Sequence, residues 1–590
     1  MRILFLGRHY TYFRNFESVL RGLAERGHAI HLAVERDETL GGLSMVQALA
    51  SEFPSITHGE APGRADDDWS WVVDRLRLGL DYLRYQHPVF DTARKLRDRS
   101  RDRTPGAFVG LGRIVRAAGG WSRVFASGVV RRIERSVPDD PAIRAYLEAQ
   151  RPDIVLLTPL IDLGSSQIEY LRAARALRMP TGLCVWSWDH LSSKALIRDA
   201  PDRVFVWNPT QKREAIELHG VPADRVVVTG AQCFDQWFDR QPSRDRGTFC
   251  RQVGLPSSPP YVLWVCSALF QGSPVEAQFV LTWIRALRDG ASLRLKAAPI
   301  LVRPHPSRLA EWEGVDLSGL NAVLWGGNPV DAQSRADYFD TLYHSAAVAG
   351  INTSAFIEAG IVGRPVHTIV VPEMADNQTG TVHFNYLLNA GGGLLEVARS
   401  FDEHVAQLDA SMAKADLPAS APGASAARRG LGEGGTVGLD TAEVKPFVRE
   451  FVRPNGLDVA ATPFFVERIE SMRDLKAAAP QADPLAAVWR WTAARAARTR
   501  DDERYERWTL SERELGSLEK LRGARGVKAQ LRADARRARD VERDARIRAR
   551  EEQRAAEQQA RAERAAAKAR QLAEKRERGD AERTAKQRAG

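Results

Sequence analysis

Short, fully apolar runs recur along the sequence with helical segments between them, and this rhythm limits the fold more than any other feature. Residues 1–7 have the pattern of a buried strand, 16–26 that of an amphipathic helix, and 29–34 that of a second strand. Parallel strands buried on both faces are near-continuous apolar runs, and a helical crossover must connect them. The first 34 residues therefore predict a β-α-β unit, the start of a doubly wound domain.

The same alternation continues in two blocks of the chain. Further apolar runs predict parallel strands at 154–157, 181–186, 203–207 and 225–230 in the first block, and at 261–266, 299–302, 347–350 and 366–370 in the second. Helical segments separate these runs. We therefore predict an α/β protein in which two doubly wound, Rossmann-like domains, residues 1–240 and 256–415, face a cleft.

Other segments depart from this alternation. Residues 60–148, rich in Arg, Asp and Trp, predict a mostly helical insertion in the first domain, and the polar residues 236–258 suit a connection between the domains. Residues 416–440, dominated by Ala, Ser and Gly, predict a flexible linker, and 441–475 predict a closing helical segment. Residues 500–590 repeat Arg, Ala and Glu without a heptad seam, which favours a charged, solvated helix over a tight coiled coil.

The basic charge of the chain is confined to its end. The sequence has 85 Lys and Arg against 75 Asp and Glu, a net charge of +10. Residues 521–590 hold 22 of the basic and 12 of the acidic residues, so the rest of the chain has 63 of each. The positive charge therefore belongs to the tail, and a nucleic-acid partner for the globular part is not expected.

The amino-terminal apolar run is too short for a signal peptide, and no stretch approaches the ~20 apolar residues of a membrane helix. We expect a cytoplasmic protein, and a peripheral position at the inner membrane face stays open. The four cysteines form no CxxC pair, which is typical of buried thiols in a reducing compartment; they are Cys184, Cys233, Cys250 and Cys266.

Ligands of doubly wound domains bind at the carboxyl ends of the strands, so the residues that follow each predicted strand are the candidates for a site. After the strand at 347–350 come Asn352, Thr353 and Ser354, which are all good helix N-caps. Amide groups at a helix start together with hydroxyls can hold a phosphate. Glu358, one turn further along, can accept hydrogen bonds from sugar hydroxyls. The alternative is an ordinary capped helix between two strands.

The string N-T-S-A-F-I-E-A-G-I-V-G-R-P-V at 352–366 resembles the donor-site segment of GT-B glycosyltransferases and the matching segment of non-hydrolysing nucleotide-sugar 2-epimerases. This resemblance implies that Asn352, Thr353 and Ser354 bind a nucleotide diphosphate and that Glu358 lies near the ribose or the sugar.

A second resemblance concerns residues 303–306. Arg303-Pro304-His305-Pro306 is similar to an element of CDP-glycerol glycerophosphotransferases and related capsule and teichoic-acid polymerases, which implies that Arg303 and His305 meet phosphate. An ordinary strand-ending turn is the alternative. The sequence has Asn352-Thr353-Ser354 where the glycerophosphotransferases have Asp-Tyr-Ser-Ser, so the resemblance does not specify glycerol phosphate transfer.

The first domain offers candidates for catalysis. His9 follows the first strand and is a candidate base. Trp186 and Trp188 supply flat apolar surfaces that suit a sugar or base, although core packing explains tryptophans equally well. Asp189 and His190 form a possible acid–base pair, and Lys194 can supply charge for a phosphate; these three residues close the same segment.

Taken together, these residues predict a transferase that moves a glycosyl or polyol-phosphate group from a nucleotide-activated donor to a cell-surface glycan or lipid-linked acceptor. No DxD string stands where a metal-bound diphosphate would need it, so we expect metal-independent transfer without a cofactor. Two alternatives remain: a nucleotide-sugar 2-epimerase, and a non-catalytic scaffold whose basic tail binds RNA or a membrane surface.

Overall fold

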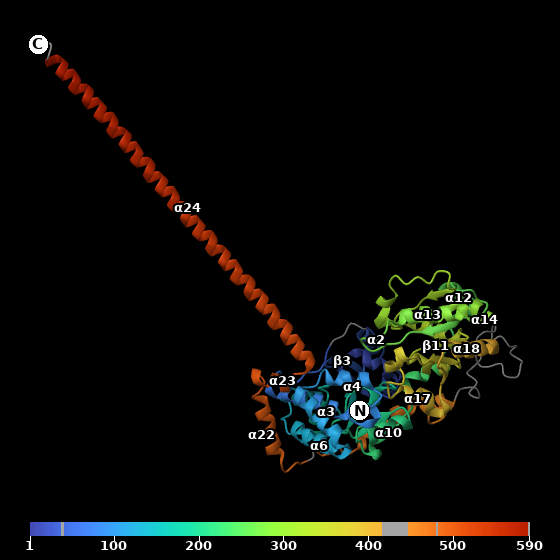
Figure 1. Ribbon diagram of the computed structural model, residues 1–590. Helices are drawn as coiled ribbons and strands as arrows, with labels where there is room; N and C mark the ends of the chain where they lie inside the picture. Colours follow the sequence, from blue (N-terminus) through green and yellow to red (C-terminus); the bar gives the residue numbers. More distant parts are fainter. Residues whose placement is uncertain (37–40, 416–445, 480–481, 588–590) are drawn as a thin grey trace. The chain divides into compact units, whose positions relative to one another are not determined.

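The computed structural model describes residues 1–36, 41–415, 446–479 and 482–587 (Figure 1). The chain divides into two compact units, Met1–Glu512 and Arg513–Gly590. The first unit contains two separate parallel sheets with helices on their faces, which confirms the predicted α/β fold with two doubly wound domains. The linker predicted at 416–440 lies outside the described residues.

Within the described residues, the first sheet has seven strands in the order β3-β2-β1-β4-β5-β6-β7, and all of them are parallel. The order reverses between β1 and β4, which is where a doubly wound sheet opens its ligand crevice. The strands are β1 (Arg2–Gly7), β2 (Ala29–Val34), β3 (Ile56–Glu60), β4 (Ile154–Thr158), β5 (Thr181–Cys184), β6 (Arg203–Val206) and β7 (Val226–Val228).

Successive residues of a strand point to opposite faces of the sheet, and β1 buries both sets. Ile3 and Phe5 pack with one group of helices, and Leu4 and Leu6 with another. This double burial explains why the central strands are continuous apolar runs. The helices on the first face are α1 (Glu17–Glu25) and α2 (Gly42–Glu52); those on the second are α7 (Pro141–Gln150), α8 (Ile168–Ala176) and α10 (Pro209–Glu217).

The second sheet repeats the plan, with six described strands in the order β10-β9-β8-β11-β12-β13. All of its pairings are parallel, and its order reverses between β8 and β11. The strands are β8 (Val262–Val265), β9 (Ile300–Arg303), β10 (Ala322–Leu324), β11 (Ala347–Gly350), β12 (Val366–Ile369) and β13 (Leu395–Ala398). The helices of this domain are α13 (Glu276–Asp289), α14 (Leu293–Ala297), α15 (Ala332–Tyr343), α16 (Ala355–Ile361), α17 (Phe384–Asn389) and α18 (Phe401–Ala415).

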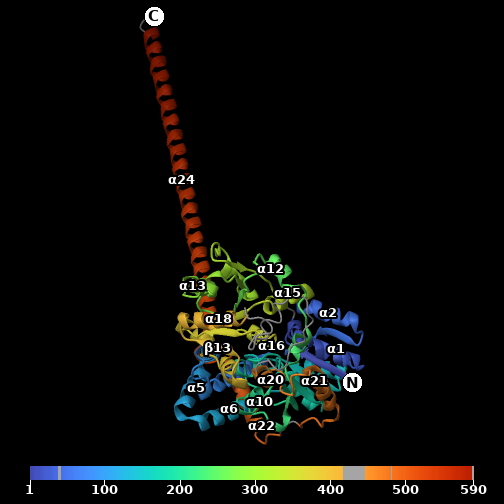
Figure 2. The same ribbon diagram turned by 90° about the vertical axis from the view of Figure 1, so that its right-hand side faces the viewer.

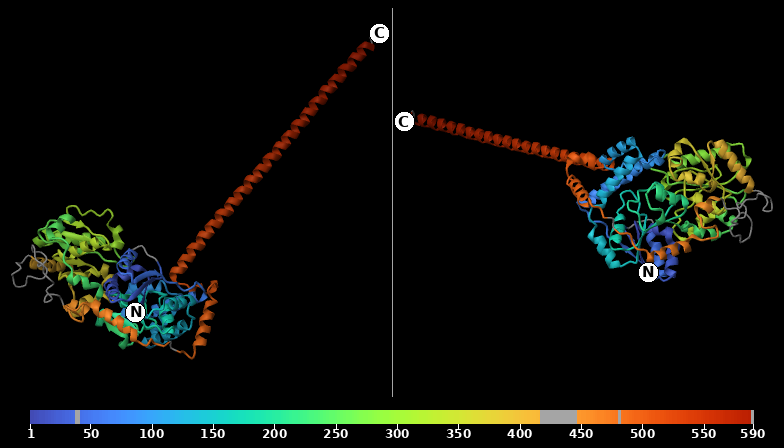
Figure 3. Two further views of the ribbon diagram at one scale, coloured as in Figure 1. Left: turned by 180° about the vertical axis from the view of Figure 1, so that it is seen from behind. Right: turned by 90° about the horizontal axis from the view of Figure 1, so that it is seen from below.

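The segment predicted as a mostly helical insertion, residues 60–148, includes helices that pack in two different ways. Of its first four α-helices, the first, third and fourth pack against one another, and the second packs beside the first. α22 (Ala486–Ala497) packs against the first and the fourth, as the light-blue and orange ribbons of Figure 3 show. The fifth helix, α7, instead buries Ile143 and Leu147 against the first sheet and so belongs to the doubly wound plan. The four insertion helices are α3 (Asp68–Arg84), α4 (Arg94–Arg101), α5 (Gly106–Ala118) and α6 (Gly120–Arg135).

The polar stretch 236–258, expected as a connection, also forms helices: α11 (Asp235–Asp239) and α12 (Arg246–Val253). Phe249, Cys250 and Val253 of α12 enter the core of the second domain. Three apolar residues on one face of a short helix are sufficient for this packing, and the surrounding polar residues hide the pattern in the sequence.

After the second domain, the chain returns to the first. α20 (Pro446–Phe451) ends the second domain, and α21 (Ala461–Glu470) packs Phe465, Val466 and Ile469 against the first sheet beside α1 (Figure 2). The return passes beside β7, where the Ala231 amide donates to the Val452 carbonyl over 2.9 Å. Asp235 accepts from the amides of Ala461 (3.0 Å) and Thr462 (2.7 Å).

The second unit is a single helix, α24 (Glu512–Gln587). Its few large apolar side chains are exposed, as Leu531 and Val541 illustrate, and ion pairs such as Arg546 with Glu542 (2.6 Å) span one turn. Such pairs, one turn apart, stabilise solvated helices. No helix among the described residues is both long enough and apolar enough to cross a membrane.

Candidate functional site

The switch point of the second sheet lies between β8 and β11, and the residues that follow these strands meet there. Gly350 ends β11, and a Cβ at this position would lie 2.6 Å from the Val265 carbonyl oxygen of β8, so only glycine fits. Just beyond, the Asn352 amide donates to the Ser267 hydroxyl over 3.1 Å. The predicted segment Asn352–Ser354 therefore occupies the crevice of the second domain.

The three predicted cap residues have different environments. The side-chain amide of Asn352 donates to the Asn377 carbonyl over 2.7 Å and lies 3.4 Å from His383 Nε2. The Thr353 hydroxyl accepts weakly from the Ala355 amide at 3.4 Å. Ser354 is the residue before α16, but its hydroxyl makes no capping bond and its side chain is exposed. Of the three, Ser354 is the one presented to an incoming group.

Glu358, in the first turn of α16, is held by a phenol from the neighbouring helix. The Tyr338 hydroxyl of α15 donates to its carboxylate. Burial raises the pKa of Glu358 to about 7, although the bond from Tyr338 and the charges of Arg14 and Arg303 oppose this rise. Glu358 can therefore be protonated or ionised near neutral pH, which is a property of acid–base groups.

Arg303, at the end of β9, packs against Tyr338, the residue that donates to Glu358. Its guanidinium lies over the Tyr338 ring, 4.6 Å from the ring centre, and donates to the Gly327 carbonyl over 2.7 Å. Gly326 has a φ of 109°, and a side chain at this position would occupy the space that the Arg303 guanidinium fills. The structure thus brings Arg303 together with Glu358, through Tyr338.

A cavity of about 240 Å³ lies between the two domains and brings the predicted segments together. The first domain contributes residues that follow β1, β5, β6 and β7, and the second contributes α15, α16 and the loop before α15. These are all carboxyl-end positions or helices beside them, as expected for a ligand crevice. Its lining includes Arg14, Trp186, Trp188, Arg240, Arg335, Tyr338, Ser354 and Glu358.

Asp189 lies next to this wall and is linked to both domains. It accepts from the Ser193 hydroxyl over 2.7 Å and from the Ser187 hydroxyl. Burial would raise the pKa of Asp189, but the charges of Lys194 and His383 and these hydrogen bonds hold it well below its usual value. His383 belongs to the second domain, and its ring meets Trp188 edge-on with centroids 4.8 Å apart. Asp189 is therefore ionised at neutral pH.

The remaining predicted residues lie further from the cavity. His190 is fully buried, and burial lowers its pKa to about 3, so its ring is neutral at pH 7. His9 packs on Tyr12 at 4.5 Å, and Tyr12 meets Trp186 edge-on at 5.1 Å. His305 caps its own turn, because its Nδ1 accepts from the Ser307 amide at 3.2 Å. None of the three histidines lines the cavity.

A second carboxyl–phenol pair joins the two domains directly. The Tyr386 hydroxyl of α17 donates to the carboxylate of Glu214 on α10. Burial raises the pKa of Glu214 to about 7, against the opposing effect of the bond from Tyr386. The contact between the domains therefore includes a carboxyl group that is protonated below neutral pH.

This pair predicts a pH-dependent stability. Since the folded pKa of Glu214 exceeds its unfolded value, the folded state holds the proton more tightly, and stability is lost as the pH rises from about 4.5 through about 7. Glu214→Gln should remove this loss, so its Tm relative to wild type should increase between pH 5 and pH 8, equivalent to on the order of 3 kcal/mol. Thermal unfolding of both proteins at pH 5 and pH 8 measures this difference in Tm. Parallel curves for the two proteins would contradict the prediction.

No family model matches the chain, and no curated protein matches it in sequence. Solved structures similar to it include a UDP-GlcNAc 2-epimerase from Methanocaldococcus jannaschii, with 10% identity over 80% of this chain and 99% of that one and a TM-score of 0.42. A glycosyltransferase from Rickettsia africae has 12% identity over 80% of this chain and 98% of that one, with a TM-score of 0.44. The fold itself rests on the strand orders of the two sheets.

Proposed function

We propose that the protein is a GT-B-type transferase that moves a glycosyl or polyol-phosphate group from a nucleotide-activated donor to a glycan-type or lipid-linked acceptor of the cell surface. The observation that carries this proposal is the cavity between the domains, where Ser354 and Glu358 of one wall face Trp186 and Trp188 of the other. Polar groups that converge in an apolar crevice at a switch point are the usual form of a nucleotide site.

Each wall has a role in this proposal. Ser354 and the amides at the start of α16 hold the diphosphate, and Arg14 and Arg240 of the same cavity supply the positive charge, so that transfer proceeds without a metal or cofactor. Glu358 accepts from hydroxyls of the donor. The tryptophan rings pack against a sugar face. Asp189, ionised and beside the wall, is the candidate base for the acceptor hydroxyl.

A nucleotide-sugar 2-epimerase is the second candidate. Two carboxyl groups of the site have pKa values displaced in opposite directions, Asp189 below its ordinary value and Glu358 to about 7. Two carboxyls in different protonation states suit an acid–base reaction on a single sugar.

Calorimetric titration with UDP-, GDP- and CDP-sugars tests the proposal. We expect one nucleotide class to bind, and product to form only when a glycan or lipid-linked acceptor is added. Conversion of the donor alone would establish the epimerase instead. If none of the three classes binds, both enzymatic proposals fail and the non-catalytic scaffold stands. Asp189→Asn should retain donor binding and lose turnover; full turnover in that variant would remove Asp189 as the base.

A further inference from the structure

The helical hairpin of α5 and α6 exposes large apolar side chains at its tip. Ile114 is 66% exposed, Trp121 74%, Val124 65% and Phe125 67%. Single exposed apolar residues are ordinary on a protein surface, but four within residues 114–125 form a patch. Removal of this apolar surface from water is favourable, so the patch favours contact with an apolar partner.

The same hairpin is strongly basic. Residues 106–135 contain six arginines and one acidic residue, Glu134. Glu134 is fully buried and ion-paired with Arg77 and Arg172, so its charge does not reach the surface. The surface of the hairpin thus combines arginine with exposed aromatic and aliphatic groups. This combination suits the boundary region of an anionic lipid bilayer, where apolar groups enter the lipid and cations meet the headgroups.

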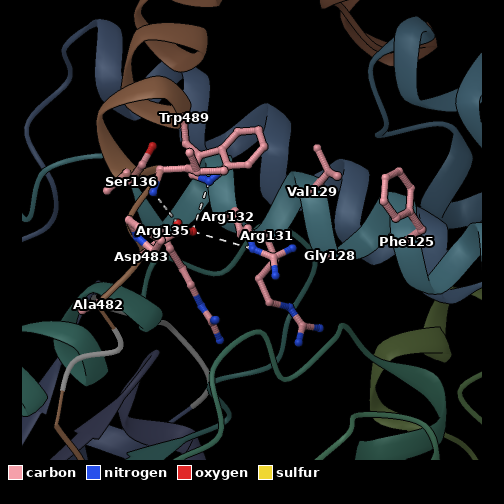
Figure 4. A pocket seen from close by; sticks show the side chains of 13 residues that line it. Phe125, Gly128, Val129, Arg131, Arg132, Arg135, Ser136, Ala482, Asp483 and Trp489 are labelled. Carbon is pink, nitrogen blue, oxygen red and sulfur yellow. Dashed lines mark hydrogen bonds and ion pairs between the residues drawn. The ribbon is translucent and has the colours of Figure 1, made fainter.

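A large cavity continues the patch along α6. Trp121, Phe125, Gly128 and Arg132 follow one another at helical spacing and so share one face of the helix. From Phe125 onward, this face lines a cavity of about 820 Å³, closed on its other side by residues 482–486 and Trp489. Figure 4 shows the arginine side chains gathered between Phe125 on one side and Ala482 and Asp483 on the other.

The cavity retains positive charge after its internal pairs are counted. Asp483 accepts from the Trp489 indole over 3.1 Å and pairs with Arg132 at 3.7 Å. Arg135 pairs with Asp199. Arg131 also lines the cavity, and among the described residues no acidic side chain forms an ion pair with it. One guanidinium is thus available for an anion.

We propose that the face formed by the α5–α6 hairpin and this arginine cavity docks on an anionic phospholipid bilayer, with Trp121 and Phe125 in the lipid boundary and a headgroup phosphate beside Arg131. The face shares no lining residue with the cavity between the domains, so the proposal does not depend on the proposed function.

Co-sedimentation of the full-length protein with vesicles tests this proposal. One vesicle set is phosphatidylcholine alone, and the other contains phosphatidylglycerol as the anionic lipid. Three variants are compared with wild type: the double variant Trp121→Ser/Phe125→Ser, the charge variant Arg131→Gln, and Leu293→Ser as a matched control. Leu293 is 80% exposed on α14 of the second domain, so its replacement removes an equally exposed apolar group elsewhere.

Wild type and Leu293→Ser should bind the anionic vesicles and bind the neutral vesicles far less. The double variant should lose binding by roughly tenfold or more, as expected for two large aromatic side chains withdrawn from lipid. Arg131→Gln should weaken binding to the anionic vesicles only.

Failure of wild type to bind anionic vesicles would overturn the proposal. Equal binding by wild type and the double variant would also overturn it, because the basic helix α24 would then account for the attraction. If the face instead joined two copies of the chain, light scattering would show a dimer that the double variant dissolves, without vesicle binding. Unchanged binding by Arg131→Gln would refute the headgroup site.

Discussion

Glu358→Ala should weaken binding of a nucleotide-activated donor by about 10- to 100-fold, because loss of a hydrogen bond to a charged group costs about 1.5–3 kcal/mol. Glu358 lines the cavity, can accept from sugar or ribose hydroxyls and is already held in place by Tyr338. The other carboxylate of the lining, Glu17, pairs with Arg335 at 3.1 Å. Titration calorimetry with the donor that wild type binds measures the change. An affinity equal to that of wild type would place the donor elsewhere.

The control for this variant is Glu470→Ala. Glu470 accepts from Arg26 (2.7 Å) and His28 (2.8 Å) on the surface of the first domain, outside the cavity, and its loss should leave binding unchanged. A pH series adds a sharper criterion. Since the pKa of Glu358 is about 7, wild type should bind more tightly as the pH rises from 6 to 8 and the carboxylate forms. Glu358→Gln should lose this pH dependence of binding, because glutamine has nearly the same size and shape as glutamate but does not titrate.

Glu134→Gln should destabilise the protein by about 3–5 kcal/mol, the usual cost when one partner of a buried ion-pair network is removed. Glu134, on the insertion helix α6, is fully buried and accepts from Arg77 (2.8 Å) and from both terminal nitrogens of Arg172. Its loss leaves two buried guanidinium groups partly unpaired. We expect Tm at pH 7 to fall by on the order of 5–10 °C, measured by circular dichroism.

The pH dependence of this effect has a defined sign. Burial alone would raise the pKa of Glu134, but Arg172 and Arg77 lower it to about 2. The stability it contributes is therefore fully present above about pH 4.5 and lost as the pH falls toward 2. The Tm difference between wild type and variant should shrink from pH 7 to pH 3. Glu148→Gln, which breaks the exposed pair with Arg144 (3.2 Å), should cost less than about 1 kcal/mol. A similar loss in both variants would contradict the assignment.

The fold could be predicted from the sequence because its central strands are buried on both faces. The prediction for β11 matches the structure residue for residue, and those for β4, β8 and β12 differ by one or two residues at the ends. The strands that escaped prediction are β3, β10 and β13, which form edges of the sheets. β3 and β13 mix polar with apolar residues, and β10 is a partly exposed strand of three residues, too short to give a clear signal. The edge strand β7, which consists of three valines, was predicted.

The candidate site was predictable only where its residues follow a strand directly. Ser354 and Glu358 carry this signal, as do the tryptophans after β5. Tyr338 and His383 do not, since they come from inside a helix and from the turn before α17, and tertiary packing alone brings them to the cleft. His190 shows the opposite error. It has the chemistry of a base, but the short helix α9 (His190–Ser193) turns its ring into the core.

The chain passes between the two domains twice, and the passages touch where Asp235 holds the amides of Ala461 and Thr462. Two domains connected by a single chain passage can rotate about that passage. Two adjacent passages restrict this rotation and leave mainly a hinge motion about the line through both passages. A single protease cut in either passage would not release a half of the molecule. In the proposed transferase, opening and closing of the cavity between the domains, rather than a twist between them, would then admit and release the donor.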